Sequence, residues 1–282
     1  MKVTALIENT KPEAKMDLVA EFGLSLYMER GIQRILFDTG ASDAFSRNAT
    51  KLGIGLQDVD VLVISHHHFD HGGGLGRFLE VNRKAKVYLR KCEEEEFYFK
   101  APLLGRRYVG LDQELLQQQA GRFEFVDDFA EILPGVYILT SIDTQYAQPK
   151  GNRRLFVKNG NVLEPDSFGH ELIMLTQEQD GLVVFSGCSH HGIRNMLSTV
   201  TRQFHNVPIK AVIGGFHLIG LPVLNTMAGS KAEIRKLGLE LLKYPVERYY
   251  TGHCTGQKAY RVLKGVMRSK LQQFQTGSEL VL

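Results

Sequence analysis

Short apolar runs alternate with polar stretches along the chain, and most of these runs have the length of a β-strand. Amphipathic segments with helical spacing lie between many of them. Strands are predicted at residues 3–8, 24–28, 35–37, 59–64, 86–89, 123–126, 136–140, 154–157, 172–175, 182–185, 209–213 and 246–250, and helices at 41–52, 75–81, 193–204 and from Ser230 towards Pro245. Strand and helix alternating in two halves predict an α/β fold of two sheets with helices outside.

Residues 91–120 are charged and polar with helical spacing, and the acidic run Glu93–Glu96 is interpreted as the solvated face of a helix. No short repeat and no low-complexity linker interrupts the chain. A single domain over residues 1–282 is therefore predicted.

The run at residues 59–64 leads directly into the densest cluster of polar chemistry in the sequence. Side chains alternate along an extended segment, so His66 and His68 are expected on one side, with Asp70 and His71 following at a turn. Imidazole and carboxylate are ligands that suit zinc, iron or manganese. The stretch therefore predicts a metal site. His67 points the other way and is expected to support a ligand or to meet solvent.

Three later strands also end in histidine-bearing loops. The strand at 182–185 precedes Cys188 and His190, the strand at 209–213 precedes His217, and the strand at 246–250 precedes His253. Four histidine-bearing loops at matching strand ends are hard to explain by core packing, so they are expected to converge on one site. Asp38, which ends the strand at 35–37, is either a helix N-cap or, as we favour, a carboxylate that orients a metal-bound histidine.

Composition narrows the class of protein further. The hydrophobic share of 43% and the charged share of 23% are ordinary for a soluble globular protein, and a net charge of +3 does not argue for a nucleic-acid partner. No apolar run approaches the roughly 20 residues that span a bilayer, and no signal peptide is expected before the first strand. Three cysteines are too few for a disulfide framework, so we expect a cytoplasmic protein with no membrane partner.

Two groups of basic residues lie in the predicted loops and polar segments. They are Arg106 with Arg107, and Lys150 with Arg153. Each group is either a solvated surface or a clamp for an anionic substrate, for which the arginine guanidinium is well suited.

The pattern His66-x-His68-x-Asp70-His71 after an apolar strand resembles the signature of the metallo-β-lactamase superfamily. Residues 187–190, 214–218 and 253–256 resemble the branch that includes 7,8-dihydropterin-6-methyl-4-(β-D-ribofuranosyl)aminobenzene-5′-phosphate synthases. The resemblance implies an αββα sandwich of two mixed β-sheets flanked by helices. It also implies two divalent metal ions, zinc or alternatively manganese or iron, about 3.5 Å apart with a shared hydroxide.

The resemblance assigns His66 and His68 to the first metal, and Asp70, His71 and His253 to the second. The third histidine of the first metal is either His170 or His190, and the match of residues 187–190 favours His190. Cys188 stands where most members place a bridging aspartate. It either ligates a metal as a thiolate or packs without one.

The expected activity is that of a metal-dependent hydrolase or related transferase, using a metal-bound hydroxide on a small anionic, phosphate-bearing substrate. Asp70 would orient the nucleophile, and His217 would act as a general acid or base. A nuclease of the same superfamily would need an extended basic surface, which this charge does not suggest. A non-catalytic metal sensor would need Cys188 in the hydroxide position. Metal identity, natural substrate and oligomeric state, a homo-oligomer included, stay open.

Overall fold

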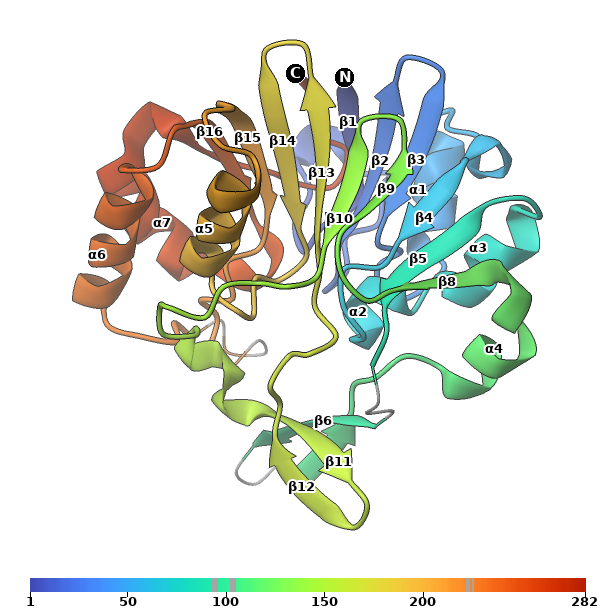
Figure 1. Ribbon diagram of the computed structural model, residues 1–282, viewed down its shortest axis with the longest axis horizontal. Helices are drawn as coiled ribbons and strands as arrows, with labels where there is room; N and C mark the ends of the chain where they lie inside the picture. The colour runs from blue at the N-terminus through green and yellow to red at the C-terminus, as the bar shows by residue number, and fades with distance from the viewer. Residues whose placement is uncertain (93–95, 102–104, 222–223, 225) are drawn as a thin grey trace. The chain divides into compact units, whose positions relative to one another are not determined.

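The computed structural model describes residues 1–92, 96–101, 105–221, 224 and 226–282 (Figure 1). The described residues form three β-sheets. The chain divides into two units. Unit 1 comprises Met1–Asp127, Arg154–His170 and Gln275–Leu282, and unit 2 comprises Asp128–Arg153 and Glu171–Phe274. Each unit is described by itself.

Unit 1 is built on a mixed seven-stranded sheet of order β18-β1-β2-β3-β4-β5-β8. The pairings from β18 to β3 are antiparallel, and those from β3 to β8 are parallel. Among the parallel strands, β4 is wholly apolar and buried, as expected for a strand that is covered on both faces. The strands are β1 (Lys2–Ile7), β2 (Ser25–Arg30), β3 (Gln33–Phe37), β4 (Val61–Val63), β5 (Lys86–Arg90), β8 (Phe123–Val126) and β18 (Glu279–Val281).

Helices of unit 1 pack on this sheet through one apolar stripe each. Helix α1 buries Phe45 and Ala49, and helix α3 buries Phe78 and Leu79, in the same core as strand residues such as Leu62. The helices and 3₁₀ turns are η1 (Glu13–Lys15), α1 (Ala44–Lys51), η2 (Leu56–Asp58), α2 (Phe69–Gly72), α3 (Leu75–Val81), α4 (Gln113–Gln118) and η3 (Ala120–Arg122).

A separate four-stranded antiparallel sheet of order β12-β11-β6-β7 also belongs to unit 1 (Figure 1). Phe97, Leu155 and Val157 on one of its faces form a small core with Val109 and Phe168. Its strands are β6 (Phe97–Ala101), β7 (Gly105–Tyr108), β11 (Leu155–Asn159) and β12 (Val162–Pro165).

The helical prediction for residues 91–120 is wrong for β6 and β7, and among the described residues of that stretch only those of α4 form an α-helix. In β6, Phe97 and Phe99 face the small core, and the residues that follow each of them, Tyr98 and Lys100, lie on the other face. This period of two builds a hairpin. Most of the acidic run lies outside the described residues, and its last member, Glu96, pairs with Lys158.

Unit 2 is built on a second mixed seven-stranded sheet, of order β17-β16-β15-β14-β13-β10-β9. The pairings from β9 to β14 are antiparallel, and those from β14 to β17 are parallel. Its strands are β9 (Ala130–Leu133), β10 (Val136–Leu139), β13 (Ile173–Glu178), β14 (Gly181–Ser186), β15 (Ile209–Gly214), β16 (Val246–Thr251) and β17 (Leu271–Gln273).

Helices α5, α6 and α7 contribute Met196, Ile234 and Leu263 to one apolar core with strand residues such as Val184 and Val212. A capping box of Ser230 and Glu233 opens α6, at the predicted start of this helix. The helices and turns are η4 (Lys150–Arg154), α5 (Ile193–Gln203), α6 (Lys231–Leu241), η6 (His253–Thr255), α7 (Gln257–Met267) and η7 (Arg268–Lys270). Among the described residues, no helix has both the length and the apolar character needed to cross a membrane.

Candidate metal centre

In unit 1 the candidate ligands lie at the carboxyl ends of two neighbouring parallel strands. Strand β3 ends just before Asp38, and strand β4 leads into residues 65–72, which we call the histidine loop. The loop ends in the short helix α2 and is anchored at Thr39, whose backbone N–H donates to the His71 carbonyl over 2.7 Å. Side chains from both strand ends are thereby brought together.

Asp38 fixes the histidine loop through its buried carboxylate. Oδ1 accepts from the Ser65 N–H over 2.7 Å, and Oδ2 accepts from Ser65 Oγ over 2.8 Å. Oδ2 also lies 2.6 Å from His71 Nδ1. The N-cap alternative for Asp38 is wrong, because α1 begins at Ala44 after the N-cap Asp43. Asp38 instead orients the His71 ring.

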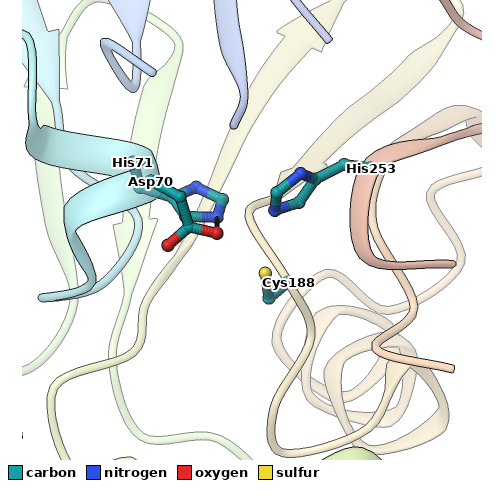
Figure 2. Close-up of side chains that lie close together, drawn as sticks. All are labelled: Asp70, His71, Cys188 and His253. Carbon is teal, nitrogen blue, oxygen red and sulfur yellow. Dashed lines mark ion pairs between the residues drawn. The ribbon is translucent and has the colours of Figure 1, made fainter. Parts of the chain in front are cut away.

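His66 and His68 lie on one side of the histidine loop, as the alternation predicts. Their ring centroids are 4.7 Å apart, and each offers a ring nitrogen within 4.8 Å of the other. Asp70 Oδ2 lies 3.8 Å from His71 Nε2 (Figure 2). His66 Nδ1 lies 2.9 Å from Ser65 Oγ.

His67 and His170 form a second histidine pair behind the loop. The His67 N–H donates to His170 Nδ1 over 3.0 Å, and His67 Nε2 lies 2.9 Å from the Arg90 carbonyl oxygen. Burial, followed by the nearby His170, lowers the pKa of His67 to about 3. His67 supports the loop from behind, and the alternative that it meets solvent is wrong because its side chain is buried.

Asp166 is a buried carboxylate at this site that the sequence reasoning missed. Its Oδ2 lies 3.1 Å from His170 Nε2 and 3.8 Å from His68 Nε2. Burial would raise the pKa of Asp166, but the neighbouring His170 and His68 outweigh it and lower the pKa below its ordinary value. For the His68 imidazole, burial has the opposite effect and lowers the pKa. His68, Asp166 and His170 offer ligand atoms within 4.8 Å of one another.

In unit 2 the candidate ligands follow three adjacent parallel strands, β14, β15 and β16. Cys188, His190 and His217 offer ligand atoms within 4.8 Å of one another, and so do Cys188 and His253. With Cys254 these residues form what we call the cysteine–histidine cluster. Figure 2 draws Cys188 and His253 of this cluster together with Asp70 and His71 of unit 1.

His190 is held by side chains from two distant segments. Its Nδ1 lies 3.0 Å from Asn152 Oδ1, and Asn152 Nδ2 donates to the His190 carbonyl over 2.8 Å. Glu171 accepts from the His190 N–H over 2.7 Å. No pattern in the sequence pointed to either partner, because both lie outside the motif.

Glu171 also holds His191. His191 is buried, its N–H donates to Glu171 Oε2 over 2.8 Å, and its Nδ1 lies 2.8 Å from the same oxygen. Burial would raise the pKa of Glu171, but the hydrogen bonds from His191 and His190 outweigh it and lower that pKa.

His217 has a left-handed backbone, with φ of 47°, and its ring centroid lies 4.1 Å from that of His190. A Cβ at Gly151 would lie 2.6 Å from the ring, so only glycine fits there. The Nδ1 atom is buried and has no hydrogen-bond partner among the residues that the structure describes. An unsatisfied buried nitrogen of this kind is expected where a ligand or substrate completes the site.

Cys254 contacts two other members of the cysteine–histidine cluster. Its Sγ accepts from the His217 N–H over 3.3 Å and contacts the Cys188 carbonyl oxygen at 3.5 Å. Burial would raise the pKa of this thiol, but hydrogen bonds with Cys188 and His217 outweigh it and hold the pKa well below its ordinary range. A Cβ at Gly215 would lie 2.2 Å from this sulfur, which explains the second glycine before Phe216.

The four basic residues proposed for anion binding have different surroundings. Arg106 and Arg107 are exposed on β7 in unit 1. In unit 2, Lys150 forms an ion pair with Glu233, and Arg153 is exposed.

Comparisons with known proteins place this chain in a family. Residues 19–145 match the family model of the metallo-beta-lactamase superfamily. The 7,8-dihydropterin-6-methyl-4-(beta-D-ribofuranosyl)-aminobenzene-5′-phosphate synthase of Methanocaldococcus jannaschii is 30% identical over 92% of this chain and 89% of its own length. The chain belongs to the metallo-beta-lactamase superfamily.

Solved structures agree with this assignment. The crystal structure of Tm1679, a metal-dependent hydrolase of the beta-lactamase superfamily, is 31% identical, with a TM-score of 0.82 over 100% of this chain and 99% of that one. The metallo-beta-lactamase fold protein YhfI of Bacillus subtilis has a TM-score of 0.57 at 12% identity over 99% of both chains, and supports the fold alone. The predicted fold class, mixed sheets flanked by helices, is confirmed. Members of the superfamily typically bind divalent metal ions, and most are metal-dependent hydrolases.

Proposed function

We propose that the protein is a metal-dependent hydrolase that acts on a small phosphate-bearing substrate with two divalent metal ions as cofactors. The proposed ligands are His66, His68, Asp70, His71, Cys188, His190 and His253.

The proposal is supported by the ring nitrogen on which each histidine holds its hydrogen, because a metal needs the other nitrogen free. Ser65 Oγ donates its one hydrogen to Asp38, so His66 Nδ1 must carry the hydrogen that joins it to Ser65. His71 Nδ1 faces the Asp38 carboxylate, which only accepts. In each ring the hydrogen therefore resides on Nδ1, and Nε2 keeps the lone pair that a metal needs.

His190 in unit 2 follows the same rule. Asn152 Nδ2 donates to the His190 carbonyl, so the Asn152 oxygen is the atom that faces His190 Nδ1 and accepts from it. Nε2 of His190 is therefore the ring nitrogen with a lone pair.

His170 has the opposite tautomer. Its Nδ1 accepts from the His67 N–H, so its hydrogen resides on Nε2 and is directed at Asp166. Neither nitrogen keeps a lone pair for a metal. This contrast supports His190 over His170 as the third ligand of the first metal.

The donor set fits borderline divalent ions, with zinc as the proposed metal and manganese or iron as alternatives. When bound, such ions supply Lewis acidity and a water of lowered pKa. Asp70 would accept a hydrogen bond from the attacking water and align it. His217, whose buried Nδ1 has no partner among the described residues, would hold or deliver a proton to the leaving oxygen.

A phosphate-bearing substrate is supported by the exposed arginines on β7 and by the name of the Methanocaldococcus jannaschii synthase, which includes a 5′-phosphate. That relative is a synthase, so transfer to an acceptor other than water is the second candidate. The same residues would serve either reaction, because both need an activated nucleophile beside an anionic group.

Turnover of aryl phosphomonoesters and phosphodiesters tests the proposal. We expect the zinc- or manganese-loaded protein to hydrolyse at least one class, and the chelated protein to lose that activity. A His217→Ala variant should keep its metal content and lose turnover, whereas loss of metal would make His217 a ligand. Metal binding without turnover of any ester would contradict the hydrolase proposal. It would favour a synthase or a non-catalytic metal sensor.

A further inference from the structure

The two adjacent arginines of β7 lie on opposite faces of the four-stranded sheet. In the β6–β7 pairing, Arg107 is opposite Phe99 and Arg106 is opposite Lys100. Directly opposed residues share a face, and neighbours in a strand point to opposite faces. Arg106 and Arg107 therefore cannot clamp the same anion.

The face of Arg107 covers the histidine loop. Phe97, two residues before Phe99 and on the same face, has its ring centroid 6.0 Å from that of His68 and 4.4 Å from that of His170. The backbone also joins the two segments, because the Phe69 N–H donates to the Val109 carbonyl over 2.8 Å. The sheet is thus fastened directly to the loop that carries the proposed ligands.

Arg107 itself lies beside that loop. Its guanidinium carbon is 5.5 Å from the ring centroid of Phe69, the residue between His68 and Asp70. Among the residues that the structure describes, no carboxylate forms an ion pair with Arg107. Stacking on an aromatic ring leaves the guanidinium edge able to donate two parallel hydrogen bonds.

Arg106 differs in each of these respects. Its guanidinium lies 5.3 Å from the ring centroid of Tyr98, on the opposite face. It lies close enough to Glu96 to contribute to lowering the pKa of that carboxyl, after the larger contributions of Lys158 and Tyr98. Its charge is therefore partly offset on a face turned away from the histidine loop.

We propose that Arg107 recognises the phosphate group of the substrate beside the histidine loop, and that Arg106 does not. This inference rests on the proposed function and names the specificity-determining residue for it. A guanidinium fork matches two oxygens of a phosphate, and losing such charge-assisted hydrogen bonds weakens binding by about tenfold to a hundredfold.

Titration calorimetry with phenyl phosphate on the metal-loaded protein tests the inference, with Arg107→Gln, Arg107→Lys and the matched control Arg106→Gln. We expect Arg107→Gln to weaken binding about tenfold to a hundredfold, Arg106→Gln to change it less than about twofold, and Arg107→Lys to fall between them. If a substrate is turned over, the Arg107→Gln loss should appear in KM more than in kcat.

Equal losses in Arg106→Gln and Arg107→Gln would show general electrostatic attraction and overturn the inference. So would unchanged binding in Arg107→Gln, or wild-type protein that binds no phenyl phosphate. Metal content and ester turnover, measured on the same samples, judge the proposed function separately. Both arginines are exposed, so neither variant should lose its fold.

Discussion

The two units share one sheet plan but build their candidate ligands in different ways. Each sheet has three antiparallel pairings followed by three parallel ones, and the candidate ligands follow the parallel strands. Unit 1 places four of them in one loop, where the Asp38 carboxylate contacts His71 directly and His66 through Ser65. Unit 2 takes its candidate ligands from three loops, and Asn152 and Glu171 hold His190. In unit 1 one carboxylate thus reaches two candidate ligands, whereas in unit 2 two side chains hold one.

The largest effect is expected in unit 1, from Asp38→Ala. Removing this carboxylate leaves the Ser65 N–H and the His71 Nδ1–H unsatisfied in a buried site. We expect a loss of about 2–4 kcal/mol in unfolding free energy and about a tenfold to hundredfold loss of metal affinity. Urea denaturation measures the unfolding free energy, and metal titration measures the metal affinity. Asp17→Ala, at an exposed aspartate of the same unit, is the control, and equal effects in both variants would refute a special position for Asp38.

A smaller loss of unfolding free energy is expected in unit 2 from Glu171→Gln, because Asn152 also holds His190 there. Glutamine keeps one accepting oxygen but cannot satisfy both His190 and His191. Unfolding free energy should fall by about 1–3 kcal/mol, measured against the exposed control Glu164→Gln. An unchanged midpoint would mean that Glu171 does not hold the loop.

The next effect concerns the orientation of one ring. Asn152→Ala removes the acceptor of His190 Nδ1, which frees the ring to rotate or change tautomer. We expect about a tenfold loss of metal affinity with about 1 kcal/mol of stability lost, and no change in the exposed control Asn161→Ala. Unchanged metal affinity would separate Asn152 from the site.

The smallest effect is expected far from the ligands, at Glu233. The Lys150 ammonium, and then the Ser230 N–H, lower the pKa of Glu233 to about 2 from 4.5. Because the folded pKa is the lower one, this carboxylate stabilises α6 above its unfolded pKa, and the contribution is lost as pH falls through about 2. Thermal denaturation should show Glu233→Gln slightly less stable than wild type at neutral pH. A gap as large near pH 3 as at pH 7 would contradict the ion pair.

The contrast between the units also explains what could be predicted from the sequence. The histidine loop could be predicted because its candidate ligands lie within one short segment and begin on alternate positions of an extended chain. The strand-end positions of Cys188, His190 and His253 were found because each follows an apolar strand. Asp166, Glu171 and Asn152 were missed, because a residue that meets its partner only through the fold leaves no local pattern.

The error at residues 91–120 has a related cause. A charged stretch with Phe97 and Phe99 two residues apart fits a strand face, but the surrounding acidic and glutamine-rich residues favour a helix. Phe97 contacts His170, which is distant in sequence, and such tertiary contacts favour the strand over the helix.

Metal content per chain is the most direct test of the central claim that the chain binds two metal ions through the proposed ligands. Elemental analysis of protein purified without chelator would compare wild type with His71→Ala in unit 1, His253→Ala in unit 2, and the exposed control His205→Ala. The account predicts about two ions in wild type and the control, and about one in each ligand variant. Wild type without metal, or full content in either His71→Ala or His253→Ala, would contradict it.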